Sequence, residues 1–397
     1  MTTKKLSNNN KIIKQLYFAG SMSCADFSLQ LKKSLPFTTK LVNDLVEEDV
    51  IVETGFAPST GGRRPLMYSI KPDTLYIIAV AIDQFVTRIA LMDSNNQVVG
   101  KVEKIDLPLS ENEEALIVLS EHLNYFIQQT KIAHARIVGI GIGMPGFVDI
   151  QRGINHSFLK TPQEYGNESI TKFLSEKLNL PVFIDNDSSV TALAELRFGA
   201  GISRKNVMVI NAGWGVGLGM ILNGDLYRGA SGFAGEFSHI PLFTNNKLCS
   251  CGKSGCLETE TSLSVLIEKF NSALQKGRVS MLRGITTESL EKASEQIVQF
   301  ALEGDRLAVE LLSEIGYKIG RGIAILIHLL NPELIIISGR GTQAGKIWQA
   351  PIQQALNEHC IPRLAQNTKI EISNLGFDAS LIGAAALVME NYDHVQD

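Results

Sequence analysis

One histidine and three cysteines stand close together in the sequence, at a spacing suited to binding a metal ion. They are His239, Cys249, Cys251 and Cys256. One imidazole and three thiolates supply the four ligands that tetrahedral zinc prefers, and glycines between the thiols let the chain turn tightly. Because protein fills all four coordination positions, the segment predicts a structural Zn²⁺ site. The alternative is three unlinked thiols beside a surface histidine.

Two further groups of polar and glycine residues follow predicted strands. Asn186 and Asp187 come directly after the apolar run PVFID. A carboxylate there can accept a hydrogen bond from a ligand hydroxyl, or act as a general base, but such residues are equally typical of turns and helix caps. The alternating glycines of Gly213–Gly219 could bring backbone N–H groups to a phosphate, or form a tight turn without a ligand.

Strands and helices alternate from Leu75 onward. Short apolar runs bounded by turn residues predict the strands, and apolar side chains at helical spacing predict the helices. The expected strands are 75–81, 88–92, 137–142, 180–184, 207–210 and 334–338, and the expected helices are 115–129, 190–198, 260–275, 287–303 and 305–330. This alternation indicates an α/β fold. The polar and glycine-rich groups follow strands, where ligands of such folds bind.

The first 70 residues have a different pattern. Helices are expected over 8–19, over 24–33 and from Pro36 onward, and strands over 50–54 and 66–70. Ser23 and Asp26 form a capping box for the second helix, and proline is tolerated at the start of the third. Three helices followed by a hairpin with a glycine-rich tip predict a winged helix-turn-helix.

A winged helix-turn-helix places its third helix in the major groove of DNA. The expected free face of that helix carries short polar and basic side chains, which suit base edges. These candidates are Thr38, Thr39, Lys40 and Asn43. Arg63 and Arg64 at the wing tip could enter a minor groove or belong to a solvated linker. The alternative for the whole segment is a small helical domain that contacts protein.

The distribution of charge favours DNA binding by the front segment. Residues 1–72 contain ten Lys/Arg and six Asp/Glu, and the other 325 residues contain 27 Lys/Arg and 35 Asp/Glu. The two parts therefore carry +4 and −8, which gives the whole chain its net charge of −4. A basic N-terminal segment joined to an acidic body indicates an anion-binding module, although ordinary variation of surface charge would give the same distribution. The apolar runs are far shorter than the roughly 20 residues that cross a bilayer, and no signal peptide is recognisable, so the expected location is cytoplasmic.

Together these signals resemble the ROK family, named for repressors, open reading frames and sugar kinases. The most specific match is GASGFAGEFSHIPL followed by CSCGKSGCLE, at 229–242 and 249–258. The resemblance implies a two-lobed actin-like (ribonuclease H-like) body with a sugar in its cleft. The implied domains are a DNA-binding domain at 1–72, an N-terminal lobe at 73–198 and a C-terminal lobe with the zinc site at 199–397. The last helix can return to the N-terminal lobe.

The resemblance also implies which residues contact the metal ion and the sugar. In the family pattern, His239, Cys249, Cys251 and Cys256 are zinc ligands. The residues at sugar-contacting positions are Gly146, Asn186, Asp187, Glu236, His239 and Glu258. His239 belongs to both sets, which its two ring nitrogens permit. Asp187 is at the position of the kinases' general base, and the N-terminal winged helix with its GGRRP tip is similar to the repressor branch.

The sequence departs from the kinase pattern in both phosphate loops. Where kinases have Asp-x-Gly-Gly-Thr, this chain has DQFVT at 83–87, and Phe85 and Val86 should block close approach of the backbone to phosphate. Trp214 replaces a frequent threonine in the second loop. A general base without a positioned phosphoryl donor gives little turnover, so we expect no enzyme activity and no catalytic residue.

The expected function is therefore a sugar-responsive, DNA-binding transcriptional regulator, in the first place a repressor. Its expected partners are a double-stranded DNA operator and a small sugar or sugar phosphate, and its expected cofactor is structural zinc. A homodimer or homotetramer would suit a palindromic operator with half-sites about one helical turn apart. The alternative is an active ROK sugar kinase, which phosphorylates a hexose or N-acetylhexosamine with ATP and carries an added DNA-binding domain.

Overall fold

The computed structural model describes residues 3–58, 64–109, 112–161, 169–282 and 289–394. The chain packs into two compact units, one made of Met1–Asn186 with Leu381–Asp397 and the other of Asp187–Ser380. Among the described residues, no helix combines the length and the apolar character needed to cross a membrane.

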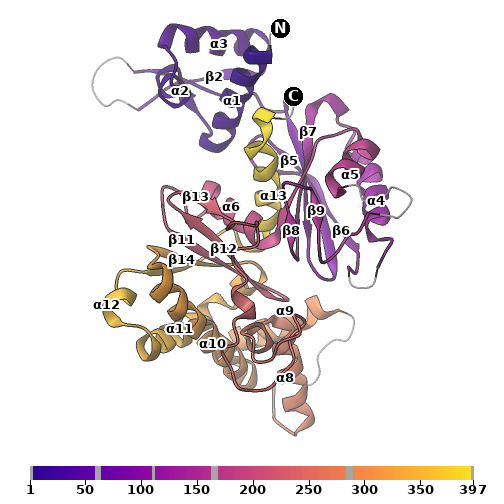
Figure 1. Cartoon of the computed structure of the whole chain (residues 1–397), viewed down its shortest axis with the longest axis vertical. Coiled ribbons are helices and arrows are strands. Elements are labelled where there is room, and N and C mark those ends of the chain that lie inside the picture. Colours follow the sequence, from indigo (N-terminus) through magenta and orange to yellow (C-terminus); the bar gives the residue numbers. More distant parts are fainter. Residues whose placement is uncertain (1–2, 59–63, 110–111, 162–168, 283–288, 395–397) are drawn as a thin grey trace. The chain divides into compact units, whose positions relative to one another are not determined.

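The N-terminal segment of the first unit folds as a winged helix-turn-helix (Figure 1). Its elements are α1 (Thr3–Ala19), β1 (Met22–Ser23), α2 (Cys24–Leu31), α3 (Leu35–Glu47), β2 (Ile51–Phe56) and β3 (Leu66–Ile70). The predicted capping box is present, because Ser23 Oγ accepts from Asp26 N at 3.3 Å and Asp26 Oδ2 accepts from Ser23 N at 2.9 Å. The small sheet has the order β1-β3-β2, so β2 and β3 form the wing.

A five-stranded sheet forms the centre of the rest of the first unit. Its strands are β4 (Tyr76–Ile82), β5 (Val86–Asp93), β6 (Val98–Asp106), β7 (Ile137–Met144) and β10 (Val182–Asn186), with the short hairpin β8 (Val148–Asp149) and β9 (Ile154–Asn155) beside them. β4, β5 and β6 form an antiparallel meander, and β7 and β10 continue the sheet in parallel on the other side of β4. Buried side chains from α4 (Ala115–Thr130) and α5 (Ile170–Leu178) complete its core.

The second unit contains a sheet with the same connectivity. Its strands are β11 (Val207–Ala212), β12 (Val216–Leu222), β13 (Asp225–Tyr227), β14 (Leu334–Ser338) and β15 (Lys369–Ile372). The order β13-β12-β11-β14-β15 repeats the order β6-β5-β4-β7-β10 of the first sheet, with the first strand at the centre in both. Two sheets of this order are the architecture of the actin-like, ribonuclease H-like fold. The protein is therefore an α/β chain with a winged helix ahead of an actin-like body.

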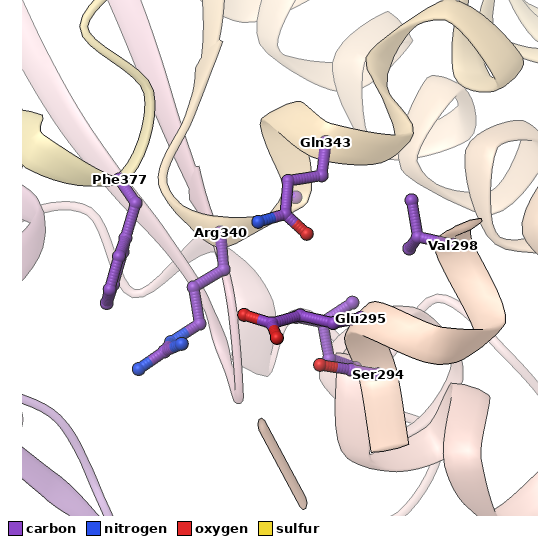
Figure 2. A pocket seen from close by; sticks show the side chains of 8 residues that line it. Ser294, Glu295, Val298, Arg340, Gln343 and Phe377 are labelled. Carbon is purple, nitrogen blue, oxygen red and sulfur yellow. The ribbon is translucent and has the colours of Figure 1, made fainter. Parts of the chain in front are cut away.

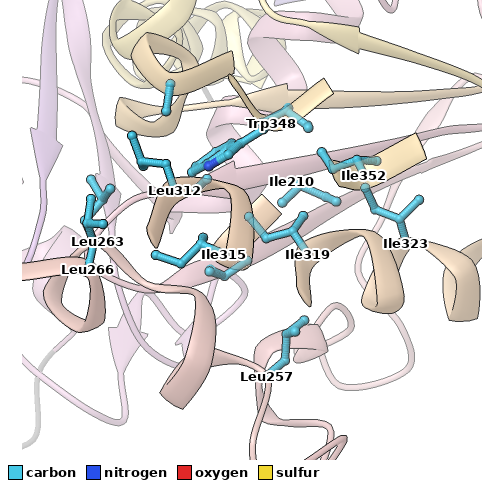
Figure 3. Close-up of a cluster of buried hydrophobic side chains, with 14 of the residues drawn as sticks. Ile210, Leu257, Leu263, Leu266, Leu312, Ile315, Ile319, Ile323, Trp348 and Ile352 are labelled. Atoms are coloured by element: carbon cyan, nitrogen blue, oxygen red, sulfur yellow. The ribbon is translucent and has the colours of Figure 1, made fainter. Parts of the chain in front are cut away.

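Helices supply most of the core of the second unit. They are α6 (Asp187–Phe198), α7 (Glu258–Thr261), α8 (Leu263–Gln275), α9 (Leu290–Leu302), α10 (Arg306–Leu330), α11 (Gly345–His359) and α12 (Pro362–Ala365), and α13 (Ala379–Glu390) leads back to the first unit. Ile319 and Ile323 of α10 lie in one buried cluster with Ile210 of β11 and Ile352 of α11 (Figure 3). Gly320 lets α10 and α11 approach closely, because a Cβ there would lie 2.7 Å from that of Ala355.

A largely buried carboxylate ties a loop of the second unit to two of these helices. Glu260 accepts a hydrogen bond from Asn245 in the loop, from Lys269 of α8 at 2.8 Å and from Lys318 of α10. Burial alone would raise the pKa of Glu260, but these donors outweigh it and lower the pKa to about 2. The charged form of Glu260 is therefore the one that stabilises the fold.

We expect Glu260→Gln to lower the free energy of unfolding by about 1–3 kcal/mol at pH 7, because it removes one of the two carboxylates, Glu260 and Glu314, that Lys269 and Lys318 share. A carboxyl whose pKa is depressed by folding stabilises above its unfolded pKa of about 4.3 and loses that effect as pH falls towards the folded value. The difference between the two proteins should therefore shrink below about pH 5.

Urea unfolding of both proteins across this pH range measures the difference. Glu268→Gln is the matched control, since Glu268 pairs with Lys247 at the surface and its side chain is 64% exposed. The control should change the free energy of unfolding by less than about 1 kcal/mol. Equal losses in the two variants would show that the buried network does not stabilise the protein.

Candidate functional site

The four residues predicted to bind a metal ion come together in the second unit. Their ligand atoms all lie within 4.8 Å of one another. Cys251 Sγ lies 3.7 Å from Cys256 Sγ, and Cys249 Sγ lies 3.5 Å from His239 Nδ1. A tetrahedral zinc ion with bonds of about 2.3 Å to sulfur and about 2.05 Å to nitrogen requires separations of about 3.75 and 3.55 Å. These two separations match those around a bound zinc ion, so the group could hold a metal ion.

The ionisation of the thiols depends on such a cation. Burial, together with the neighbouring thiols, raises the pKa of Cys256 to about 12. Partial burial also acts to raise the pKa of Cys251, but hydrogen bonds from the Lys253 backbone and from the other thiols lower it overall. Three thiolates cannot share this volume without a positive charge between them, which a divalent metal ion would supply.

The imidazole of His239 faces two different groups. Its Nδ1 is the nitrogen nearest the thiols, and its Nε2 lies 3.6 Å from Glu236 Oε2. His239 ends the short 3₁₀ turn Phe237–His239, in which Phe237 is buried and fixes the turn against the core. The two predicted roles of His239 therefore use different ring atoms.

Glu236 brings a carboxylate close to this histidine, and the charge of Glu258 acts on Glu236. Burial is the main cause that raises the pKa of Glu236; the Glu258 charge adds to it and His239 opposes it. Glu258 begins α7, and its carboxylate packs against Gly215, where a Cβ would lie 2.6 Å from Oε2. The glycine-rich turn thus makes room for this side chain. Carboxylates and an imidazole provide the acceptors and donor that suit sugar hydroxyls.

Asp187 is held at the start of α6 in the same unit. Its Oδ1 accepts from the backbone N of Ser188 at 2.8 Å, and Asn211 of β11 donates to its Oδ2 at 3.4 Å. The carboxylate is fixed in orientation by these two contacts. It can accept a hydrogen bond from a hydroxyl, or a proton in an enzyme.

In the first unit, the structure joins Gly146 and Asn186. Asn186 Nδ2 donates to the Gly146 carbonyl at 3.1 Å. Gly146 has φ +94°, and a Cβ there would lie 2.6 Å from Ser157 Cβ, so glycine is required. Asn155 also holds this loop, because its Nδ2 donates to the Pro145 carbonyl at 2.9 Å. The loop is thereby fixed at the end of β7 next to Asn186 at the end of β10.

The segment that corresponds to the first phosphate loop is closed by its own aspartate. Asp83 Oδ1 accepts from the backbone N of Phe85 at 2.9 Å and of Val86 at 2.8 Å. The backbone N of Asp83 in turn donates to the Val86 carbonyl at 3.0 Å. Backbone N–H groups that a phosphate loop would direct at a nucleotide are therefore used within the turn. The bulk of Phe85 and Val86 was the obstruction expected from the sequence; an aspartate two residues before a backbone donor is the usual signal of such a turn.

Side chains fill the space beside the second glycine-rich turn. Trp214 is buried, and the Arg340 guanidinium lies between its ring, 5.4 Å away, and the ring of Phe377, 3.9 Å away. Arg340 Nη1 also pairs with Glu291 at 2.7 Å. Figure 2 shows the neighbouring cavity, whose volume of about 20 Å³ has room for roughly one water molecule. The residues that line it are Leu263, Ser294, Glu295, Val298, Arg340, Gly341, Gln343 and Phe377.

The predicted DNA-contact residues are placed differently from one another. Lys40 and Asn43 are exposed on α3, and Thr39 is partly exposed. Thr38 is fully buried, and its hydroxyl donates to the Ser34 carbonyl at 3.1 Å. The prediction that Thr38 lies on the free face was wrong. It precedes Leu41, Val42 and Leu45 by three, four and seven residues, so it shares their buried side of the helix.

At the tip end of the wing, Arg64 donates from Nε to the Ala57 carbonyl at 2.8 Å, and from its second terminal nitrogen to the Phe56 carbonyl at 3.4 Å. The side chain thus bridges the ends of the wing while its charge remains exposed. Arg63 lies outside the described residues.

Three comparisons relate the chain to known proteins. The sequence profile of the ROK family matches residues 77–391. The xylose repressor of Caldicellulosiruptor bescii is 30% identical over 356 residues, which cover 89% of this chain and 88% of the repressor.

Solved structures of ROK family proteins are also similar to this chain. A ROK family transcriptional regulator, described as a homologue of the Escherichia coli Mlc protein, has a TM-score of 0.79 at 28% identity and covers 99% of this chain and 98% of its own. A ROK family glucokinase from Streptomyces griseus, solved with glucose and AMPPNP, has a TM-score of 0.67 at 26% identity and covers 98% of its own chain but 79% of this one. With a family match that spans most of its length, the chain belongs to the ROK family.

Proposed function

We propose that the protein is a sugar-responsive transcriptional repressor whose kinase-like body binds a sugar but transfers no phosphate. The observation that carries the proposal is the closed turn at Asp83, whose carboxylate accepts the N–H groups of Phe85 and Val86. A carboxylate bonded to those donors competes directly with a nucleotide phosphate for them. The winged helix that precedes the body would bind the operator DNA.

The proposal for DNA rests on the exposed face of α3 and on the relatives. Lys40 and Asn43 are exposed and can reach phosphate or base edges, as can the partly exposed Thr39. The regulator homologous to Mlc matches nearly the whole of this chain, whereas the glucokinase matches a smaller part of it. Arg64 keeps its proposed minor-groove role, for which its guanidinium would exchange its contacts with the Phe56 and Ala57 carbonyls for contacts with DNA.

The proposed sugar contacts in the second unit are three carboxylates and the imidazole of His239. Asp187, Glu236 and Glu258 can accept hydrogen bonds from sugar hydroxyls, and His239 can donate through Nε2. Gly146 and Asn186 are the proposed contacts from the first unit. The proposed effector is a small sugar or a sugar phosphate.

We further propose that the metal ion is Zn²⁺ and that its role is structural. Cys249, Cys251, Cys256 and His239 Nδ1 would be its ligands, which leaves no position for water or substrate. When bound, the ion would neutralise the thiolates and fix the loop that carries His239. The protein would act in the cytoplasm as a homodimer or homotetramer, since a palindromic operator requires two recognition helices.

An active sugar kinase is the second candidate, because an aspartate, Asp187, remains at the general-base position of the kinases and a glucokinase shares the fold of the body. The filled space at Trp214 and Arg340 argues against it.

The response to sugar should depend on Asp187. With an operator selected from random duplex DNA, Asp187→Asn should bind the operator as the wild type does. It should need about 10–100-fold more sugar for release, because it loses one charged hydrogen-bond acceptor. Asp225→Asn, an exposed carboxylate on β13, is the control. Gel-shift titration with a panel of sugars gives the measurement; an Asp187→Asn protein that responds like the wild type would remove Asp187 from the sugar site.

The second prediction separates the two candidate functions. In a coupled ATP assay with hexoses and N-acetylhexosamines, turnover should stay at least about 100-fold below the roughly 1–100 per second of kinases. The same preparation should gain thermal stability with one of these sugars, which shows that the body is folded and binds ligand. Turnover within the kinase range, on the sugar that stabilises the protein, would establish the kinase instead.

The third prediction concerns the metal. Elemental analysis should find about one zinc ion per chain in the wild type and in Cys24→Ser, and little in Cys251→Ser. Cys251 is exposed, so its replacement removes a ligand with little loss of packing. Zinc affinity should fall as pH is lowered, because each thiol must lose its proton to bind. A Cys251→Ser protein with undiminished zinc would exclude this group as the site.

A further inference from the structure

We propose that Phe37 reads a thymine methyl group in the operator and so sets part of its sequence specificity. The inference rests on the proposed DNA-binding function. Phe37 lies in the first turn of α3, and 42% of its surface is exposed. In helix-turn-helix proteins the N-terminal residues of the recognition helix reach the base edges.

The periodicity of α3 places Phe37 beside the polar DNA candidates. The helix buries Leu41, Val42 and Leu45. At about 100° per residue, Phe37 and Lys40 lie on the same side of the helix, and Phe37 is roughly 90° away from the centre of the buried stripe. The exposed surface of the first two turns therefore presents an aromatic ring next to an ammonium group.

The charges along α3 indicate which end of the helix faces DNA. Its first turn carries no acidic residue, and Lys32 and Lys33 are exposed in the preceding turn. The exposed acidic residues lie at the other end, where Glu47 and Glu48 complete the helix. Because a phosphate backbone repels carboxylates, the end with Phe37 is the one suited to enter the groove.

The apolar ring of Phe37 limits which group of a base it can contact. Phe37 has no hydrogen-bonding group in its side chain, so it cannot bind the acceptors and donors of the base edges. In the major groove only thymine presents an apolar group, its C5-methyl. Covering that methyl removes apolar surface from water on both partners. Each half-site should therefore contain a thymine opposite Phe37.

Uracil substitution tests this contact one methyl group at a time. With the operator selected from random DNA by the full-length protein, each thymine of a half-site is replaced by deoxyuridine, and affinity is measured by fluorescence anisotropy. At one thymine position, replacement by deoxyuridine should lower the affinity of the wild-type protein about fourfold per half-site, which is the effect of one buried methyl group. Phe37→Ala should bind the thymine and uracil duplexes within about 1.5-fold at that position.

Two further variants distinguish recognition of the thymine methyl group from a loss of DNA affinity that is the same for every sequence. Phe37→Leu keeps an apolar side chain and should retain part of the discrimination. Phe56→Ala removes another exposed phenylalanine, on strand β2 of the wing, and should keep the full preference for thymine whatever its affinity. A wild type indifferent to every methyl, or a Phe37→Ala protein that still discriminates, would overturn the assignment. If instead no sequence is enriched in the selection, the proposed function itself fails.

Discussion

The two nitrogen atoms of His239 couple the metal-binding loop to the candidate sugar site. Nδ1 lies with the thiols of the cysteine group, and Nε2 points at Glu236. When Nδ1 binds a metal ion, Nε2 must carry the proton and can only donate. The metal loop would therefore decide the polarity of a hydrogen bond some distance from the ion. One histidine could in this way serve both proposed sets of residues, and the cysteines would then influence a site that they do not touch.

The body has the fold of a ROK family glucokinase, and the turn at Asp83 is closed by the aspartate's own carboxylate. Sequence reasoning expected obstruction by the side chains of Phe85 and Val86. The structure adds a separate cause, since the carboxylate of Asp83 accepts both backbone N–H groups. Beside the second glycine turn, Arg340 stacks between Trp214 and Phe377. The two features lie in different parts of the chain, one in each compact unit.

Much of the architecture could be predicted, and the misses have physical reasons. β3, β14 and α10 agree with the sequence to within one residue, because each has a strong apolar pattern with clear ends. β6 was missed since its side chains are largely exposed and carry no buried stripe, and β12 was missed because its glycines indicate a turn. The duplicated sheet order depends on long-range pairing that leaves no repeat in the sequence. For the site, cysteine spacing predicted the ligand group, whereas polarity alone misplaced Thr38 on the free face of its helix.

The free energy required of a sugar sensor is modest compared with that required of a kinase. A 100-fold change in operator affinity corresponds to a coupling free energy of about 2.7 kcal/mol between sugar and DNA. A hydrogen bond to a charged group contributes roughly 1.5–3 kcal/mol, so one or two of the carboxylate contacts of Asp187, Glu236 and Glu258 are enough if they form in only one state. Tight contacts that form equally in both states would shift nothing. Because coupling is reciprocal, operator DNA must weaken sugar binding by the same factor, and selection for the response acts on the few contacts that differ between the states.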